Sequence, residues 1–313
     1  MDEAKPSRRR RWVLVAAAAV VIVLVGAVVL RAVVFRDRAR VVSTDEALDR
    51  YRTQASSIPV DAAVSATTVA VIAPPTLPVV SSTASTAPAS PSSTATSTSL
   101  LTTSTAPTVP VALVASGVYR YATRGQEHVG ALDGTTHPYP PETTITVVTA
   151  GCGVSLRWDA LRERWDEWQL CATPAGVVLG TDGIQYHEFF GQPDNEAVAC
   201  DAPVMLVAAA SGDHAPAQQA CMLAEDPWLP LWTTLERSPR TIDGQLVDVQ
   251  HVQMQIEDDD EYWEHTTIDW YLAPDGLPVE VVATKSSLSP SPIGPIQYDE
   301  QYHLELESLT PLR

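Results

Sequence analysis

The sequence predicts a mainly β protein: a curved antiparallel sheet or half-barrel that lies outside the cytoplasm, preceded by one transmembrane helix and a disordered linker. Three observations lead to this prediction. A long apolar run lies near the N-terminus, a stretch rich in Ser, Thr, Ala and Pro follows it, and from residue 116 aromatic and β-branched runs alternate with polar residues between turns. Such alternation is typical of strands with one buried face. The β domain should therefore occupy residues 116–313.

The apolar run covers residues 12–35 and contains a single charge, Arg31. About 20 helical residues cross the hydrocarbon core of a membrane, so the run is long enough to span it. A secretory signal peptide is the alternative, but its apolar core has about 7–15 residues and ends at a small-residue cleavage site. This run instead continues into R-D-R-A-R-V-V. We therefore expect a single-pass membrane anchor.

Orientation across the membrane depends on the cysteines and the linker, because basic residues lie on both sides of the apolar run. Lys5 and the arginines of residues 8–11 precede it, whereas Arg31 lies near its end and three more arginines follow within residues 36–40. Four cysteines in a β domain are typical of disulfides, which persist in oxidising compartments outside the cytoplasm. The sequence thus predicts a cytoplasmic basic N-terminus over residues 1–11 and an extracytoplasmic C-terminal domain in the cell envelope.

Two segments connect the predicted anchor to the β domain. Residues 36–52 are predicted to contain a short juxtamembrane helix, because Ser43 and Glu46 have the spacing of a capping box. We expect this helix to end near Arg52 and to be solvated. Residues 53–115 form the linker, whose composition cannot bury enough apolar surface to offset its ordering entropy. As a coil of about 60 residues it would act as a tether with a reach of roughly 40–45 Å.

The charge of the β domain excludes one class of partner. From Leu113 onward the chain carries 9 Lys and Arg against 31 Asp and Glu, a net charge of −22. Phosphate backbones and anionic membrane surfaces repel such a body. Nucleic acid is therefore excluded as a partner, and the predicted partners are the membrane, through the anchor, and an apolar ligand or an envelope protein.

The best-defined hairpin joins the first two cysteines. Pairing residues whose numbers sum to 323 matches three kinds of favourable cross-strand pair. These pairs are Cys152 with Cys171, Trp158 with Trp165, Arg157 with Asp166, and Asp159 with Arg164. The register predicts the disulfide Cys152–Cys171. Proximity and elimination predict Cys200–Cys221 as the second.

Further hairpins follow along the chain. A turn is expected at Asp182-Gly183, whereas residues 192–230 are ambiguous, since V-M-L-V-A-A-A fits a short strand or a helix.

Pairing about Asp259 would place a core face on the two flanking strands, made of Val252, Met254, Ile256, Tyr262, Ile268, Trp270 and Leu272. The last strand should bury Ile296, Tyr298, Tyr302, Leu304 and Leu306, with Asp299, Gln301, His303, Glu305 and Glu307 outward.

The element W-Y-L-A-P-D-G-L-P-V-E-V, from Trp270 to Val281, resembles the strand, turn and strand of lipoprotein-carrier half-barrels of the LolA and LppX type. The resemblance implies a strongly curved antiparallel sheet around an apolar cavity that holds acyl chains. The helical anchor and the four cysteines depart from that family. G-V-Y-R-Y-A-T-R-G and the region around G-C-G-V also resemble actinobacterial single-pass membrane proteins, a likeness that implies no activity.

The sequence contains no strong catalytic motif: no nucleophile elbow, H-E-x-x-H, P-loop, dinucleotide fingerprint or C-x-x-C. His251 and His265 would be diagonal neighbours in the pairing about Asp259, with Thr267 and Asp269 on the same face, but the solvated face of a hairpin has the same pattern. The acidic run 257–261 lacks the glycine and ligand spacing of a calcium loop. We therefore predict no catalytic residues, no metal site and no cofactor.

The predicted function is a non-catalytic binding module for an apolar or lipidic ligand. Its candidate ligand-binding residues are aromatic: Trp158, Trp165, Trp168, Tyr186, Phe189, Trp270 and Tyr302. Aromatic side chains in strands more often form core. A solid-core domain for protein–protein interaction is thus one alternative, and an envelope hydrolase with an unrecognised site is another.

Overall fold

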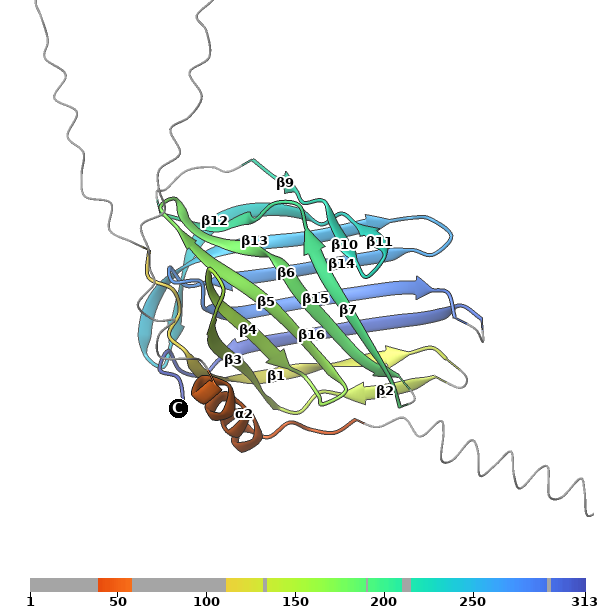
Figure 1. Cartoon of the computed structure of the whole chain (residues 1–313), viewed down its shortest axis with the longest axis horizontal. Helices are drawn as coiled ribbons and strands as arrows, with labels where there is room; N and C mark the ends of the chain where they lie inside the picture. The colour runs from red at the N-terminus through yellow and green to blue at the C-terminus, as the bar shows by residue number, and fades with distance from the viewer. Residues whose placement is uncertain (1–38, 58–110, 132–133, 190, 210–214, 292–293) are drawn as a thin grey trace, which may run out of the picture. The chain divides into compact units, whose positions relative to one another are not determined.

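The computed structural model describes residues 39–57, 111–131, 134–189, 191–209, 215–291 and 294–313, which form one helix and a single large antiparallel sheet (Figure 1). The helix is α2 (Thr44–Ser57). The strands are β1 (Gly117–Val129), β2 (Thr135–Pro138), β3 (Glu142–Ala150), β4 (Gly153–Asp159), β5 (Arg164–Thr173), β6 (Gly176–Phe189), β7 (Gln192–Cys200), β8 (Val204–Ala208), β9 (Ala217–Gln218), β10 (Cys221–Leu223), β11 (Asp226–Trp228), β12 (Leu231–Ile242), β13 (Gln245–Asp258), β14 (Glu264–Leu272), β15 (Pro278–Ser289) and β16 (Ile296–Leu306).

The sheet has two arms that meet at β1. The first arm runs from β3 through β4, β5, β6 and β7 to β10 and β11, and the second runs from β16 back through β15, β14, β13 and β12 to β9. The arms curl toward each other (Figure 1). Trp168 of the first arm lies with its ring centre 4.9 Å from that of Trp270 in the second. The predicted curled antiparallel half-barrel is thus confirmed.

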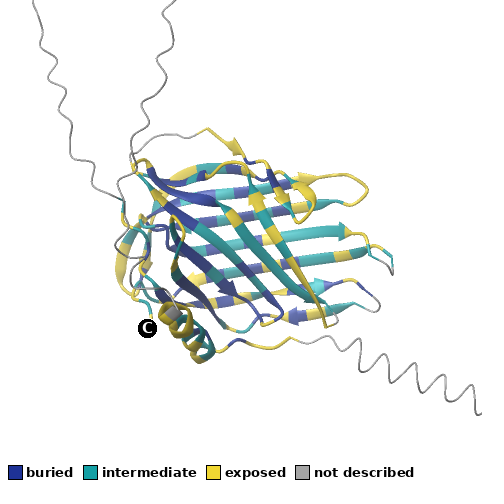
Figure 2. Cartoon of the chain, in the orientation of Figure 1, coloured by how far each residue is buried: buried dark blue, intermediate teal, exposed yellow. Residues whose placement is uncertain are grey.

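The interior is filled most densely near β1. Trp158 is fully buried, with its ring centre 4.3 Å from that of Tyr302 and 5.7 Å from that of Tyr139. Its indole nitrogen donates to Thr143 Oγ1 at 3.1 Å. Figure 2 shows buried residues concentrated over β3, β4 and β5, whereas β7 is mostly exposed or half-buried. The hydrophobic core nevertheless extends over both arms, from Trp158 to Trp232 and Trp270.

Helix α2 docks onto the first arm. Ser43 Oγ accepts the backbone N–H of Glu46 at 3.2 Å, as the predicted capping box requires. The helix then continues to Ser57, five residues beyond the predicted end near Arg52. Ala47 is fully buried, so the prediction of a solvated helix is wrong.

Ion pairs explain the docking of α2. Arg50 pairs with the buried carboxylate of Asp159, and Arg40, just before the helix, pairs with the buried carboxylate of Glu163. Buried carboxylates are costly without such partners. Residues on both sides of 58–110 thus belong to one compact unit with the sheet, so the linker does not separate the helix from the β domain.

The hairpin of β4 and β5 forms one position away from the predicted register. Gly153 faces Cys171, and Trp158 faces Asp166 rather than Trp165. Because a shift of one residue moves side chains to the other face, Trp158 enters the core and Trp165 lies outside. Trp165 stacks on Tyr186 at 5.0 Å, and the Arg157 guanidinium lies 3.6 Å from the Trp165 ring centre. These contacts cover the Trp165 ring on the outer face, so it does not need a cross-strand contact with Trp158.

Both predicted disulfides are present. Cys152–Cys171 joins the ends of the β4–β5 hairpin with its Cα atoms 5.1 Å apart, inside the usual range for a disulfide despite the shifted register. Cys200–Cys221 joins directly opposed residues of β7 and β10. It therefore fastens the edge of the first arm.

The turn predicted at Asp182-Gly183 is wrong, because β6 runs unbroken through it. The register between β5 and β6 shifts here: Leu170 faces Leu179 and Trp168 faces Gly183. β6 changes partner at the same place, pairing with β8 before the irregularity and with β7 after it. The glycine and aspartate therefore mark a bulge rather than a hairpin.

The remaining predictions concern individual strands. The ambiguous V-M-L-V segment is a strand, β8. The hairpin of β13 and β14 keeps the predicted core face but pairs Val252 with Trp270, so Tyr262 lies exposed in the loop. In β16, Tyr302, Leu304 and Leu306 are buried as predicted, while Ile296 and Tyr298 are only partly buried. Glu300 is also buried: it shares the inward face with Tyr298 and Tyr302, although its charge kept it off the predicted core.

No helix among the described residues is long and apolar enough to cross a membrane. The predicted anchor, residues 12–35, and most of the predicted linker lie outside those residues.

Candidate functional site: a tryptophan-lined cleft between the arms

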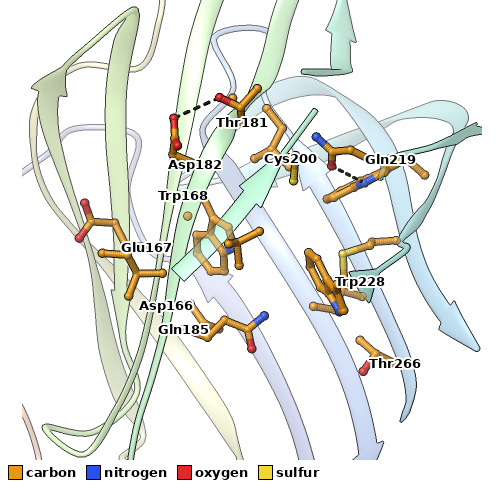
Figure 3. Close-up of a pocket in the computed structure, with 18 of the residues that line it drawn as sticks. Asp166, Glu167, Trp168, Thr181, Asp182, Gln185, Cys200, Gln219, Trp228 and Thr266 are labelled. Carbon is orange, nitrogen blue, oxygen red and sulfur yellow. Dashed lines mark hydrogen bonds between the residues drawn. The ribbon is translucent and has the colours of Figure 1, made fainter. Parts of the chain in front are cut away.

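A cleft with an unfilled volume of about 630 Å³, including its opening to solvent, lies between the two arms (Figure 3). Four tryptophans line it: Trp168 of β5, Trp228 of β11, Trp232 of β12 and Trp270 of β14. Leu179, Ile184, Val198, Met254 and Ile268 add aliphatic and thioether surface. Small-molecule sites are likewise lined mostly by apolar and aromatic side chains.

Local structure explains why the space is open. Gly183 stands opposite Trp168 in the β5–β6 pairing and has no side chain to fill the cleft. An added Cβ there would lie 3.1 Å from the carbonyl oxygen of Glu167. On the other wall, Trp232 is held by its indole N–H, which donates to Gln219 Oε1 at 3.2 Å (Figure 3). Gly183 thus leaves space on one wall of the cleft, and a hydrogen bond holds Trp232 in place on the other.

Two indole nitrogens of the cleft lack acceptors. Within the described residues, neither Trp228 Nε1 nor Trp270 Nε1 has a hydrogen-bond partner, although both atoms are buried. Trp270 as a whole is only 3% exposed. Buried donors are normally paired, and leaving one unpaired costs about 1–3 kcal/mol. Four other buried polar atoms away from the cleft also lack partners among the described residues, so these two nitrogens alone do not identify a ligand site.

The other end of the cleft is polar. Asp166, Gln185, Thr266, Lys285 and Glu264 line it. Thr266 Oγ1 donates to Glu264 Oε1 at 2.8 Å. Thr181, Asp182 and Gln219 lie on the other side of the tryptophans, so polar side chains flank an aromatic middle, an arrangement that suits an amphiphilic molecule (Figure 3).

A buried ionic cluster closes the polar end. Arg164 has no exposed side-chain surface and contacts two carboxylates: its Nη2 lies 2.8 Å from Asp166 Oδ2, and its Nε lies 3.0 Å from Glu300 Oε1. Lys285 Nζ lies 3.3 Å from Glu300 Oε2 and 3.8 Å from Asp166 Oδ2. Two cations and two carboxylates thus form a neutral group joining the arms.

The ionic cluster sets the protonation of its members. Burial alone would raise the pKa of Asp166 and of Glu300, but the charges of Arg164 and Lys285 outweigh it and hold both pKa values below normal. Burial, reinforced by the nearby charge of Arg164, lowers the pKa of His187 to about 3. Near neutral pH both carboxylates are therefore ionised and His187 is neutral.

Glu196 of β7 lies close to the polar end. Burial, followed by the like charges of Asp194, Glu264 and Asp226, raises the pKa of Glu196 to about 7. Lys285 opposes this rise but does not cancel it. Carboxylates from β7, β11 and β14 thus crowd the same opening.

Only two of the predicted ligand-binding residues, Trp168 and Trp270, line the cleft. Trp158 and Tyr302 are buried core, as the alternative interpretation predicted. Trp165, Tyr186 and Phe189 do not line the cleft: the first two stack on each other, and Phe189 stacks on His187 at 5.1 Å. The wrong register for the β4–β5 hairpin accounts for the error at Trp158 and Trp165.

Sequence reasoning missed Trp228 and Trp232. Both lie in D-P-W-L-P-L-W, at the end of the ambiguous stretch 192–230. Two tryptophans four residues apart, just after Cys221, were the available signal. No sequence signal identified Lys285 or Glu264 as cleft residues, because the residues around them in the cleft are distant in sequence.

The histidine constellation does not form. His251 faces Tyr271, whereas His265 faces Glu257 further along the hairpin. His251 Nε2 lies 2.8 Å from Asp269 Oδ1, and His265 Nε2 lies 2.9 Å from Asp259 Oδ1. No group of three or more His, Cys, Asp or Glu side chains in the described part of the chain is placed to hold a metal ion.

Comparison with protein-family models, with curated proteins and with solved structures gives no significant match to this chain. The geometry of the cleft is therefore the basis for a functional proposal.

Proposed function

We propose that the protein is a membrane-anchored binding module of the cell envelope that holds an apolar or lipidic ligand in the cleft between its arms, without catalysing a reaction on it. The observation that carries the proposal is the set of four tryptophans around an unfilled cleft with two orphaned indole donors. Large apolar clefts with a few polar groups are the usual form of a ligand site.

The magnitude of the apolar contact supports binding. A ligand that buries about 200 Å² of apolar surface gains about 5 kcal/mol at roughly 25 cal/mol per Å², before the cost of association. This apolar term favours an occupied cleft.

Two charged groups that line the cleft are engaged in ion pairs, which favours binding over catalysis by these residues. Asp166 and Lys285 are members of the neutral ionic cluster. A general base near neutral pH needs a pKa near the working pH, whereas Asp166 is held well below it. The cluster therefore supports a structural role for these residues.

Placement at the membrane is part of the proposal. Two disulfides support an oxidising compartment. Arg40, which contacts Glu163, follows the predicted anchor by five residues, a distance of at most about 17 Å when extended. The β domain would then lie against the membrane surface instead of sampling it on a long tether. Alkaline phosphatase fused after Arg313 should be active, and activity of a cytosolic reporter alone would contradict this orientation.

The binding proposal is tested on the full chain in lipid nanodiscs, with empty nanodiscs as the blank. N-phenyl-1-naphthylamine, a neutral apolar dye, should bind saturably to the wild type. Trp168→Ala should weaken binding about tenfold, because one aromatic wall is lost. Trp165→Ala is the matched control: it lies on the same strand but outside the cleft, and it should leave binding unchanged.

Two outcomes would contradict the binding proposal. Absence of saturable dye binding is the first, and equal binding by the two alanine variants is the second. Either would favour a solid-core domain that acts on protein partners through its acidic surface. Mass spectrometry of organic extracts of the purified chain should identify the ligand that co-purifies with it.

A further inference from the structure

We infer that the cleft selects a cationic ligand, an organic ammonium group attached to an apolar body, over neutral or anionic amphiphiles of the same size. The inference rests on the proposed binding function and names its ligand class. It follows from three features of the cleft: its own cations are neutralised, its opening carries unneutralised carboxylates, and its aromatic middle is built of indoles.

The cations at the polar end cannot serve an anionic ligand. Arg164 is fully buried and held by Asp166 and Glu300. Lys285 has 12% of its side chain exposed and faces the same two carboxylates. An anion that recruited Lys285 would leave buried carboxylates with one partner fewer, and uncompensated buried charge is strongly unfavourable. A fatty acid or phosphate headgroup therefore finds no free positive charge among these residues.

The carboxylates at the opening have the opposite character. Glu264 lines the cleft, and Glu196, Asp194 and Asp226 lie close enough to it for their like charges to interact. In the described part of the chain these four carboxylates make no salt bridge. The ammonium of Lys285 is the nearest compensation, and it is shared with the ionic cluster. A ligand cation would relieve this repulsion.

Indoles are the best aromatic partners for cations. An ammonium within about 6 Å of an indole face gains about 0.5–2 kcal/mol, most where water is excluded. Four indoles line the cleft, and buried Trp270 also offers its orphaned N–H to an acceptor on the ligand. No group of described carboxylates converges as a metal site would require. An extended organic cation fits this distribution better than a metal ion.

The inference is tested with three probes that share one apolar body: 4-phenylbutylammonium, 4-phenylbutanol and 4-phenylbutanoate. Each is titrated calorimetrically into the full chain in nanodiscs, with empty nanodiscs as the reference. The ammonium probe should bind about tenfold more tightly than the alcohol. The carboxylate probe should bind more weakly than either.

Variants locate the source of the preference. Glu264→Gln should lower the affinity for the ammonium probe about fivefold and leave the affinity for the alcohol unchanged, since only the charge is removed. Glu261→Gln is the matched control, an exposed carboxylate in the adjacent loop that does not line the cleft. It should change neither affinity.

The outcomes separate the two proposals. If the alcohol or the carboxylate binds as tightly as the ammonium probe, the cation inference is overturned while the binding function stands. If Glu264→Gln and Glu261→Gln behave alike, the preference does not arise at the cleft, and the inference is again overturned. If none of the three probes binds and the dye does not bind either, the binding function itself fails.

Discussion

The two ends of the curled sheet bury the same residue type in different ways. Trp158, near β1, is fully buried; its indole N–H donates to Thr143, and Tyr139 and Tyr302 cover its ring. Trp270, in the cleft, is nearly as buried, but its N–H has no partner among the described residues. Unpaired polar atoms are not confined to the cleft, since the hydroxyl of Tyr302 beside Trp158 also lacks a partner among the described residues. Burial therefore does not distinguish a core residue from a binding residue, whereas bordering the cleft does.

The difference between the ends has a structural origin. Near β1 both arms contribute large side chains to the interior, whereas at the cleft Gly183 faces Trp168 and contributes none. The β5–β6 bulge also lets β6 pair first with β8 and then with β7. The space that a side chain would fill at the core end is left open at the cleft end.

Removing Arg164 from the buried ionic cluster should have the largest effect on stability. Arg164→Met leaves Asp166 and Glu300 buried with Lys285 as their only cation, so the free energy of unfolding should fall by about 3–5 kcal/mol. Urea denaturation measures this change. Arg124→Met is the control, because Arg124 is exposed and its pair with Glu305 should contribute less than about 1 kcal/mol. Equal losses in the two variants would refute the role given to the cluster.

Alanine substitutions compare the two ends directly. Trp158→Ala should lower the free energy of unfolding by about 3–5 kcal/mol, because a large cavity forms in a filled core. Trp168→Ala should cost clearly less, because its ring already borders open space. Chemical denaturation of both variants measures the difference. If Trp168→Ala is the more destabilising, the cleft is better packed than its geometry indicates.

Local patterns in the sequence predicted much of this fold but little of its site. Alternation identified the core faces of β14 and β16, and four cysteines with one hairpin predicted both disulfides. The register of β4 and β5 failed because several pairings of Trp and Arg are locally favourable. Only the facing arm decides that Trp158, and not Trp165, enters the core.

The cleft could not be predicted because it depends on contacts between distant segments. Arg164 and Glu300 are 136 residues apart in the sequence. Their ion pair stabilises a buried charge on β16, a strand whose sequence predicts one buried and one solvated face. Similarly, α2 looked solvated because its partners, Asp159 and Glu163, lie far along the chain. Buried charges thus mark the long-range contacts that alternation does not encode.

The docking of α2 should depend on one arginine. Arg50→Met leaves buried Asp159 with Arg157 alone, and the free energy of unfolding should fall by about 2 kcal/mol. Amide hydrogen exchange in α2 should also accelerate. Arg52→Met is the matched control on the same helix, where the side chain is 58% exposed, and it should change neither quantity. Unchanged exchange in Arg50→Met would show that Asp159 is not what holds the helix.

The smallest expected effect concerns pH and the cleft end. Because the pKa of Glu196 rises to about 7 on folding, the folded state holds this proton more tightly than the unfolded state. The resulting stability is fully present below the unfolded pKa of about 4.5 and is lost as pH rises through about 7. His187 acts in the opposite sense: its pKa falls to about 3, so its contribution is complete above about pH 6.5 and is lost as pH falls.

Comparison of variants isolates the contribution of Glu196. Between about pH 6 and pH 8 the melting temperature of the wild type should fall relative to that of Glu196→Gln, because only the wild type acquires the extra negative charge. The ionic cluster provides the contrast, since Asp166 and Glu300 are already ionised over this range. Saturating 4-phenylbutylammonium should reduce the fall, because the ligand cation would offset the charge of ionised Glu196. Parallel melting curves for the two proteins across this range would show that the carboxylates at the opening do not repel one another.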